Sequence, residues 1–166
     1  MIPHSHCTYC GAAFPAAAGW PRTCAACGST SFRNPLPVAV VLQPVMNGGS
    51  RAGVLVVRRA IPPRLGALAL PGGYINYGET WQEAAARELR EESGLRIDPA
   101  GLREFRVRSA PDGTLIIFSL ARPIPAAALP PFQPNEEASE RLVLWEPAPL
   151  AFPLHEEMVR DFITSA

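Results

Sequence analysis

The sequence predicts an α/β protein in which a mixed sheet lies between helices, preceded by a small cysteine-rich module. Short apolar runs bounded by Gly, Pro and Asn recur after residue 35 and are typical of strands. A run of strong helix formers follows Thr80 and ends before Gly94. Two Cys-x-x-Cys pairs lie near the start of the chain. We therefore expect a metal-binding module at residues 1–34 and a main domain at residues 35–166.

The composition suits a soluble protein of one ordinary domain with a small appendage. The chain has 166 residues, 48% of them hydrophobic, and a formal net charge of zero. Neutral charge predicts no general attraction to nucleic acid or to a membrane surface. No apolar stretch reaches the roughly 20 residues that span a bilayer, and the start lacks the pattern of a signal peptide. We expect a cytoplasmic protein.

Four cysteines indicate a zinc ribbon. Cys7-x-x-Cys10 and Cys24-x-x-Cys27 are each followed directly by glycine. Four thiolates form a closed, structural zinc site. Two disulfides or four unligated thiols are the alternatives, although disulfides do not persist in a reducing cytoplasm. Because residues 1–34 are too short to build a core, bound zinc would supply their folding energy.

The main domain is expected to open with two apolar strands. These strands lie at residues 38–42 and 54–57, and the Asn-Gly-Gly-Ser turn at 47–50 predicts that they form a hairpin. A polar loop marked by two prolines follows at residues 58–64.

The second half of the chain continues the alternation of strands and helices. Apolar runs and turn residues predict three strands and a closing helix, at residues 102–108, 114–120, 142–145 and 154–164. Residues 123–139 are rich in Pro, Ala and Glu, and we expect them to form a mobile loop over the site.

The predicted central helix has clear signals at both ends. Thr80 is the expected N-cap, and Glu83, three residues on, completes a capping box. Gly94 can adopt the left-handed conformation that ends a helix. Within the helix, Arg87 is four residues from Glu83 and from Glu91, so we expect it to pair with both.

This helix carries a concentration of acidic residues. Five of the fifteen acidic residues of the chain lie between Glu79 and Glu92. At 3.6 residues per turn, the carboxylates of Glu88, Glu91 and Glu92 span an arc of roughly 100° and can converge on a small volume. Such a group repels itself unless a cation neutralises it, and Mg²⁺ prefers oxygen ligands of this kind. The segment therefore predicts a metal-dependent reaction.

Residues 73–95 resemble the Nudix box, Gly-x5-Glu-x7-Arg-Glu-U-x-Glu-Glu-x-Gly-U, where U is aliphatic, and every defined position matches. A solvated acidic helix face would not explain the two glycines, Arg87 and the two aliphatic positions together. The resemblance implies a Nudix α/β/α sandwich with a mixed sheet. It also implies a hydrolase that uses Mg²⁺ or Mn²⁺ to act on a nucleoside diphosphate linked to another moiety.

The order of zinc ribbon and Nudix domain resembles the zinc-ribbon Nudix hydrolases. This group includes the NADH pyrophosphatases, which carry a Ser-Gln-Pro-Trp-Pro-like motif shortly after the box. Residues 106–114 lack that motif, so the chain is more similar to the shorter group linked to FAD and ADP-ribose. ADP-ribose or FAD is the expected substrate, and an NADH pyrophosphatase is the alternative.

The resemblance also assigns roles to single residues. The expected metal ligands are the three box glutamates, Glu88, Glu91 and Glu92, with the backbone carbonyl of Gly72 or Gly73 as a further candidate. Arg87 would orient a carboxylate, and the general base is a box glutamate or one of Glu137 and Glu140. The candidate substrate-binding residues are Arg58, Arg59, Arg64 and Tyr74. Alternatively, the arginines are ordinary surface charges and Tyr74 packs against the helix.

Two rival functions stay open at this point. A non-catalytic ligand sensor usually has a degraded box and a DNA-binding domain, and neither is found here. The ribbon could instead bind RNA or a protein, but Arg22 and Arg33 are its only cations, so RNA is disfavoured. Contact with a protein, including homodimerisation, remains an alternative.

Overall fold

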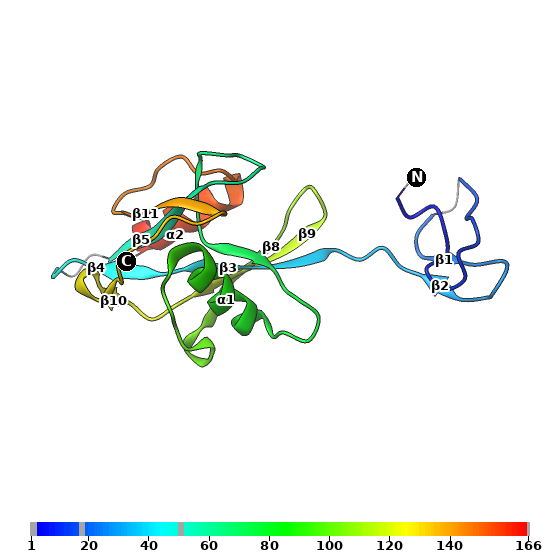
Figure 1. The fold of residues 1–166 in the computed structure, drawn as a ribbon, viewed down its shortest axis with the longest axis horizontal. Coiled ribbons are helices and arrows are strands. Elements are labelled where there is room, and N and C mark those ends of the chain that lie inside the picture. The colour runs from blue at the N-terminus through cyan, green and yellow to red at the C-terminus, as the bar shows by residue number, and fades with distance from the viewer. Residues whose placement is uncertain (1–2, 17–18, 50–51, 166) are drawn as a thin grey trace. The chain divides into compact units, whose positions relative to one another are not determined.

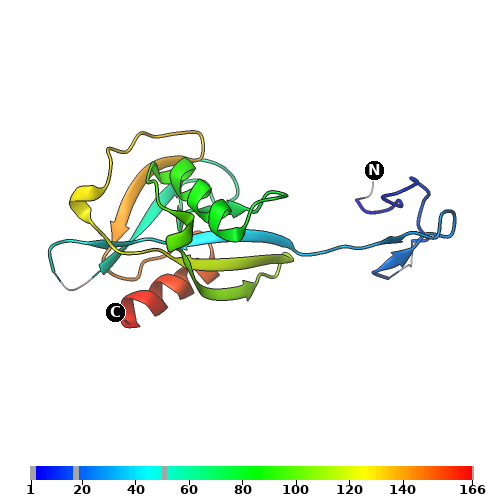
Figure 2. The same cartoon turned by 90° about the horizontal axis from the view of Figure 1, so that it is seen from below.

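Alternate residues of strand β3 (Leu36–Leu42) face two different hydrophobic cores. Ala39 and Val41 pack in the core formed with helix α1 (Trp81–Ser93), whereas Val40 and Leu42 pack in the core formed with helix α2 (Pro153–Ser165). Side chains of a strand alternate between its two faces, so one apolar run can serve both cores. The sheets consequently lie between the two helices (Figure 2).

The computed structural model describes residues 3–16, 19–49 and 52–165. They fall into two compact units, Met1–Pro35 and Leu36–Ala166. Neither helix in the described part of the chain is long and apolar enough to cross a membrane. In the second unit, shown in Figure 1, the elements beyond β3, α1 and α2 are β4 (Pro44–Met46), β5 (Ala52–Arg59), β6 (Leu68–Ala69), β7 (Gly72–Tyr74), η1 (Pro99–Gly101), β8 (Arg103–Ser109), β9 (Thr114–Leu120), β10 (Ile124–Pro125), η2 (Ala126–Ala128) and β11 (Ala138–Leu144).

Two mixed sheets form the middle layer of the second unit. One has the order β7-β3-β9-β8, in which β3 and β9 are parallel and the other pairs are antiparallel. The other has the order β10-β4-β5-β11, with β6 also paired to β5, and its β10–β4 pair is parallel. The predicted α/β/α fold with a mixed sheet is confirmed.

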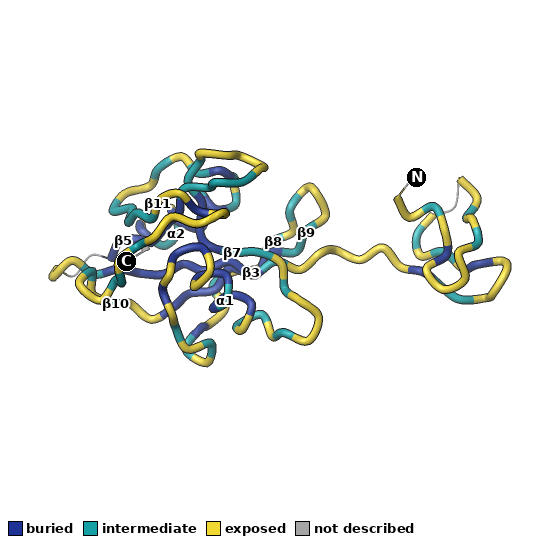
Figure 3. Tube along the Cα trace, in the orientation of Figure 1, coloured by how far each residue is buried: buried dark blue, intermediate teal, exposed yellow. Residues whose placement is uncertain are grey.

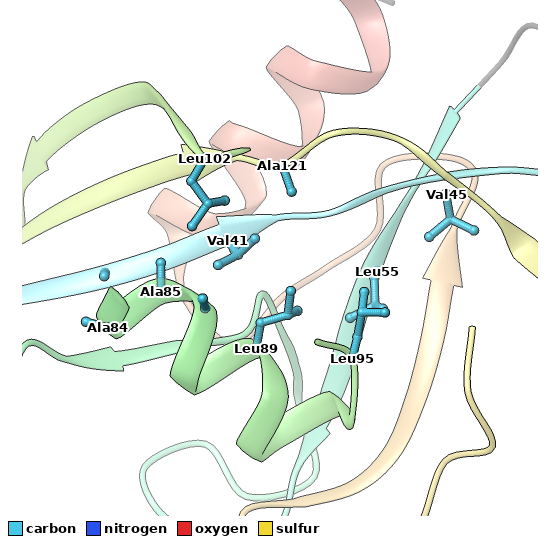
Figure 4. Packing of buried hydrophobic residues seen from close by; sticks show 11 residues of the cluster. Val41, Val45, Leu55, Ala84, Ala85, Leu89, Leu95, Leu102 and Ala121 are labelled. Carbon is cyan, nitrogen blue, oxygen red and sulfur yellow. The ribbon is translucent and has the colours of Figure 1, made fainter. Parts of the chain in front are cut away.

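The first core joins α1 to this layer. Ala84, Ala85 and Leu89 of α1 belong to the same packed cluster as Val41 and Leu55 of the strands (Figure 4). Small alanines on this face let the helix backbone lie close to the sheet, which fixes the height of the helix above it. The central strands are almost wholly buried, as Figure 3 shows.

The predicted hairpin between residues 38–42 and 54–57 is wrong. Strand β3 pairs with β7 and β9, and the antiparallel partner of β5 is the short strand β4. The chain passes from one sheet to the other at Gln43, a fully buried residue whose amide nitrogen donates hydrogen bonds to the carbonyls of Pro44 and Arg122. The predicted turn at 47–50 lies between β4 and β5, and its last residue, Ser50, is outside the described residues.

The other predicted elements of the second unit are present with small shifts. Strands expected at 102–108 and 114–120 are β8 and β9, and the closing helix expected at 154–164 is α2. Strand β11 begins four residues before the strand expected at 142–145. Residues 123–139 contain β10 and η2, which the sequence did not predict.

The first unit is a small loop-rich module. Its elements are a two-stranded antiparallel sheet, β1 (Arg22–Thr23) with β2 (Thr30–Ser31), and an isolated bridge between His6 and Ala13. Among the residues described there, Cys7 and Cys24 are the buried hydrophobic side chains, so an apolar core is nearly absent.

Candidate functional site

Helix α1 holds the acidic residues in a defined orientation because both of its ends are capped. The hydroxyl of Thr80 accepts from the backbone N–H of Glu83, and the Glu83 carboxylate accepts from the backbone N–H of Thr80. Gly94 adopts the left-handed conformation, with φ 75°, and its N–H donates to the carbonyl of Arg90. The predicted capping box and C-terminal glycine are confirmed.

Three carboxylates meet beside this helix. Oxygen atoms of Glu88, Glu92 and Glu137 lie within 4.8 Å of one another. Glu88 and Glu92 are buried, whereas Glu137 reaches the cluster from the exposed segment just before β11. The expected third member, Glu91, is outside this cluster, because its carboxylate accepts from Arg87 and Arg90.

Two glycines let strand β7 approach these carboxylates. The N–H of Gly72 donates to Oε2 of Glu92 at 3.1 Å. A β-carbon on Gly73 would collide with the carboxylate of Glu88. A β-carbon on Gly72 would lie 2.5 Å from the carbonyl oxygen of Ala39. At Gly72 the clash is with backbone atoms, so only glycine fits there, whereas at Gly73 the Glu88 carboxylate would have to shift to admit a larger residue.

Burial makes the acidic cluster electrostatically unfavourable without a cation. Desolvation, with the nearby carboxylates of Glu88 and Glu137, raises the pKa of Glu92 to about 8. Desolvation also raises the pKa of Glu88, although Arg87 opposes this shift. Buried groups of like charge are normally paired or coordinate a metal. The donor set, three oxygen ligands in a small volume, fits a hard divalent cation.

Arg87 is surrounded by acceptors. Its guanidinium donates to Glu79 at 2.7 and 3.0 Å, to Glu88 at 2.6 Å and to Glu91 at 3.1 Å. A further hydrogen bond goes to the carbonyl of Tyr74 at 2.9 Å. Hydrogen bonds from Arg87 hold the pKa of Glu79 at about 2. Arg87 therefore links the loop before α1 to one carboxylate of the cluster.

The expected pair between Arg87 and Glu83 is absent from the hydrogen bonds and ion pairs of the described residues. Glu83 is instead occupied by the backbone and hydroxyl of Thr80. A carboxylate engaged in a capping box points back to the start of its helix. The pairing with Glu91 is present.

The candidate substrate-binding arginines lie in or next to one loop. Arg58 donates to Glu140 at 2.7 Å and to the carbonyl of Gly66 at 3.0 Å, and Arg59 donates to the carbonyls of Pro62 and Pro63. These contacts hold the loop after β5 in shape.

The remaining predicted site residues lie outside the acidic cluster. Arg64 is exposed, with φ 64°, and Tyr74 is 56% exposed on β7. Glu140 pairs with Arg58 across β11 and β5. Of the two loop glutamates, only Glu137 is part of the cluster.

Sequence reasoning missed one residue of this region, Asn135, and one contact, the hydrogen bond from the N–H of Gly72 to Glu92. Asn135 donates to the carbonyl of Glu91 in α1 and accepts from the backbone N–H groups of Glu137 and Ala138. Gly72 binds Glu92 through its backbone, which no side-chain pattern indicates. The Asn-Glu-Glu run at 135–137 was a usable signal for Asn135, since asparagine often bonds the backbone two residues on.

The four cysteines form a second cluster, in the first unit. Their sulfur atoms lie within 4.8 Å of one another, with Cys7 to Cys27 at 3.8 Å and Cys10 to Cys24 at 3.6 Å, and none forms a disulfide. Zinc–sulfur bonds of about 2.3 Å in a tetrahedron require sulfur separations of about 3.8 Å. The cluster is therefore compatible with a structural zinc ion.

The two cysteine turns share one backbone pattern. Gly11 donates to the carbonyl of Cys7, and Gly28 donates to the carbonyl of Cys24, at 3.0 and 2.8 Å. Both glycines have positive φ, 76° and 73°, which explains why glycine follows each pair. Hydrogen bonds from Ser29 lower the pKa of the Cys27 thiol to about 6, which favours the thiolate form.

Comparison with known proteins decides the family. The NUDIX domain model matches residues 35–162, most of the chain. The chain belongs to the Nudix family. The predicted family is thereby confirmed, and the acidic cluster on α1 belongs to a Nudix domain.

Curated relatives of this Nudix chain include proteins of two activities. An ADP-ribose pyrophosphatase from Methanocaldococcus jannaschii is 48% identical over 42 residues, 25% of each chain. The NAD-capped RNA hydrolase NudC of Citrobacter koseri is 28% identical over 95 residues, 57% of this chain and 35% of the relative. The chain thus matches only a minor part of either relative's length.

Solved structures agree with the Nudix fold. A NUDIX hydrolase from Nitrosomonas europaea is 25% identical, with a TM-score of 0.72 over 97% of this chain and 91% of that chain. The NUDIX domain of Shewanella oneidensis NrtR, determined with ADP ribose, has a TM-score of 0.63 at 19% identity over 77% of this chain and 86% of that chain. The second likeness shows the fold alone.

Proposed function

We propose that this Nudix protein hydrolyses the diphosphate bond of a nucleoside diphosphate linked to a second moiety, with ADP-ribose or FAD as substrate. The observation that carries the proposal is the convergence of Glu88, Glu92 and Glu137 beside the Gly72–Tyr74 strand. The name of the archaeal relative, an ADP-ribose pyrophosphatase, supports the substrate class.

The roles proposed for the site residues follow from their positions. Glu88, Glu92 and Glu137 would hold Mg²⁺ or Mn²⁺, with the Gly73 carbonyl as a further candidate ligand. A bound divalent cation supplies charge neutralisation for the diphosphate and lowers the pKa of a water molecule. Arg87 keeps the Glu88 carboxylate oriented. Glu91 acts indirectly in this proposal, through its ion pair with Arg87.

Glu137 has a second candidate role. It is the exposed member of the cluster, so it can accept a proton from the attacking water and pass it to solvent. The water oxygen forms a bond to one phosphorus, the bond between that phosphorus and the bridging oxygen breaks, and the bridging oxygen leaves with the other phosphate. Glu140 is a weaker candidate base because Arg58 already binds its carboxylate at 2.7 Å.

The arginines in and next to the loop after β5 have different numbers of hydrogen-bond donors available for a substrate. Arg58 and Arg59 spend several donors on Glu140 and on loop carbonyls, whereas Arg64 and Tyr74 are exposed. We therefore assign Arg64 to direct contact with phosphate or carboxylate groups. Arg58 and Arg59 would shape the loop that presents it.

We further infer that Cys7, Cys10, Cys24 and Cys27 hold a structural zinc ion. The sulfur separations support this inference, as does the near absence of an apolar core among the described residues of the first unit.

An NADH or NAD-cap pyrophosphatase is the second candidate function, favoured by the relatives named NudC. A substrate panel separates the two. Purified protein with Mg²⁺ or Mn²⁺ is given ADP-ribose, FAD and NADH, and the products are separated by chromatography. AMP with ribose 5-phosphate or with FMN supports the proposal. A kcat/KM for NADH ten times higher than for either other substrate would favour the second candidate, and no metal-dependent turnover at all would favour a ligand sensor.

A further inference from the structure

The segment that brings Glu137 to the acidic cluster is tied to the end of α1 by two side chains. Asn135 donates to the carbonyl of Glu91 at 2.8 Å, and Arg141 donates to the carbonyl of Ser93 at 2.7 Å. We propose that Asn135, supported by Arg141, is a positioning residue that holds Glu137 beside Glu88 and Glu92. It would thereby set the affinity of the cluster for a divalent cation. The inference rests on the role proposed above for that cluster.

Asn135 fixes the backbone on the N-terminal side of Glu137. Its side-chain oxygen accepts from the N–H of Glu137 at 2.9 Å and from the N–H of Ala138 at 2.8 Å. The carbonyl of Glu137 in turn accepts from the N–H of Ala60 at 2.8 Å. Both backbone polar groups of Glu137 are therefore bonded, although the residue is exposed. These bonds fix the direction in which the Glu137 side chain projects from the backbone.

The side-chain nitrogen of Asn135 bonds this turn to α1. The last four carbonyls of a helix lack partners within the helix. Here Gly94 satisfies the carbonyl of Arg90, Asn135 that of Glu91, and Arg141 that of Ser93. Glu88 and Glu92 project from the same helix. Asn135 therefore links the backbone of the third carboxylate to the element that carries the other two.

Arg141 strengthens this arrangement from β11. Its guanidinium also donates to the carbonyl of Pro130 and lies 5.5 Å from the ring centre of Phe132. A cation at the C-terminus of a helix is favourable because the helix dipole is negative there. The segment between Pro130 and Glu137 is thus attached at both ends to the end of α1.

The expected effect of removing Asn135 is a loss of cation affinity. Without it, two backbone N–H groups and the Glu91 carbonyl lose their partner, and Glu137 can move away from the cluster. Partners that orient metal ligands typically change affinity by about 10- to 100-fold. We expect a weakening in this range for Asn135→Ala, close to the loss caused by Glu137→Gln.

Asp112 provides a matched control. Its side-chain oxygen accepts from the N–H of Thr114, two residues on, just as Asn135 accepts from Glu137. That turn joins β8 to β9, and the hydrogen bonds of the Asp112 side chain go to Thr114 within it. Asp112→Ala should therefore leave cation affinity unchanged within about twofold.

The test measures Mn²⁺ affinity without substrate, by electron paramagnetic resonance, in a double-mutant cycle. If Asn135 acts through Glu137, Asn135→Ala should weaken binding in the wild type and have little further effect in Glu137→Gln. Equal weakening in both backgrounds, or none in either, would overturn the inference. Should Asn135→Ala fail to fold, Asn135→Ser, which retains one acceptor for the turn, takes its place in the same cycle.

Failure of this inference and failure of the proposed function are distinguishable. A wild-type protein that binds Mn²⁺ and shows the expected coupling, yet hydrolyses none of the panel substrates, would overturn the proposed function and support the positioning role. If the wild type hydrolyses ADP-ribose, and Asn135→Ala has the same Mn²⁺ affinity and the same kcat as the wild type, the proposed function would be supported and the positioning role overturned.

Discussion

The backbone N–H of Gly72 donates a hydrogen bond to the buried carboxylate of Glu92, and the two atoms are 3.1 Å apart. This bond joins strand β7 to the last acidic residue of helix α1. It orients one oxygen of Glu92 and lowers the cost of burying its charge. The hydrogen bond lowers the pKa of Glu92. Burial and the nearby carboxylates raise this pKa, and their effect is larger.

Glu92→Gln should abolish most turnover while the fold is retained. The substitution keeps the side-chain volume and removes one carboxylate ligand from the cluster. We expect kcat at saturating Mg²⁺ to fall by at least about 100-fold. Circular dichroism checks the fold, and Glu104→Gln on the exposed part of β8 is the control. Near-normal kcat would exclude Glu92 from the metal site.

The same substitution should change the pH dependence of stability in metal-free protein. Because the pKa of Glu92 is raised to about 8 in the fold, its stabilising contribution is complete below the unfolded value, near 4.5. That contribution is lost as pH rises through about 8. The Tm of Glu92→Gln, relative to that of the wild type, should therefore rise between pH 5 and pH 8. Parallel Tm curves would contradict this electrostatic account.

Gly73→Ala should weaken cation binding without unfolding the protein. The added methyl group would collide with the carboxylate of Glu88, which must then leave its position. Mn²⁺ affinity, measured by calorimetry, should fall about tenfold or more. Gly49→Ala is the matched control, because a β-carbon at Gly49 meets no atom within 4 Å. Equal affinities in the two variants would show that the close approach of Gly73 has no functional role.

His155 should make the protein sensitive to acid. It is buried between the rings of Phe118 and Phe152, and its Nδ1 accepts from the N–H of Leu70 at 3.2 Å. Burial, assisted by the charge of Arg59, lowers the pKa of His155 to about 3.

A depressed histidine pKa stabilises the fold above the unfolded value of about 6.5, and this stability is lost as pH falls towards 3. His155→Gln should unfold more easily at pH 8, by about 1–3 kcal/mol, because a buried hydrogen bond is disturbed. Its stability should also depend less on pH between 6.5 and 4. Denaturant unfolding at several pH values measures both effects, and identical slopes for the two proteins would refute the prediction.

Removal of zinc should affect the first unit alone. Elemental analysis should find about one zinc per chain, and Cys10→Ser should lower that content. Because the described residues of Met1–Pro35 bury few apolar groups, NMR signals from that unit should collapse after chelation, while those of Leu36–Ala166 persist. Unchanged zinc content in Cys10→Ser would refute the ligand assignment.

Local patterns were sufficient for much of this protein. The capping box of Thr80 and Glu83, the left-handed Gly94 and the i,i+4 spacing of Glu88 and Glu92 depend on residues within one helix. The two cysteine turns are equally local, since each is closed by hydrogen bonds across a few residues. Such features depend only on residues that are close together in the chain, so the sequence by itself determined the position and chemistry of the helix.

Competition between partners limited prediction even inside the helix. Arg87 reaches Glu79 in the preceding loop, because Glu83 is already committed to Thr80. Glu91 is drawn out of the acidic cluster by Arg87 and Arg90. Spacing shows which residues can meet, but it does not show which of several acceptors a guanidinium will bind.

Only the tertiary structure decided which distant groups complete the site. Glu137 lies beside Glu88 and Glu92, with its backbone bonded to Asn135 and Ala60, and Gly72 reaches Glu92 because strand β7 lies against the helix. Likewise, the chain passes between sheets at Gln43, whose amide bonds the distant carbonyl of Arg122. Contacts between residues far apart in the chain leave no periodic signal, because they depend on how whole elements pack rather than on the spacing within any one of them.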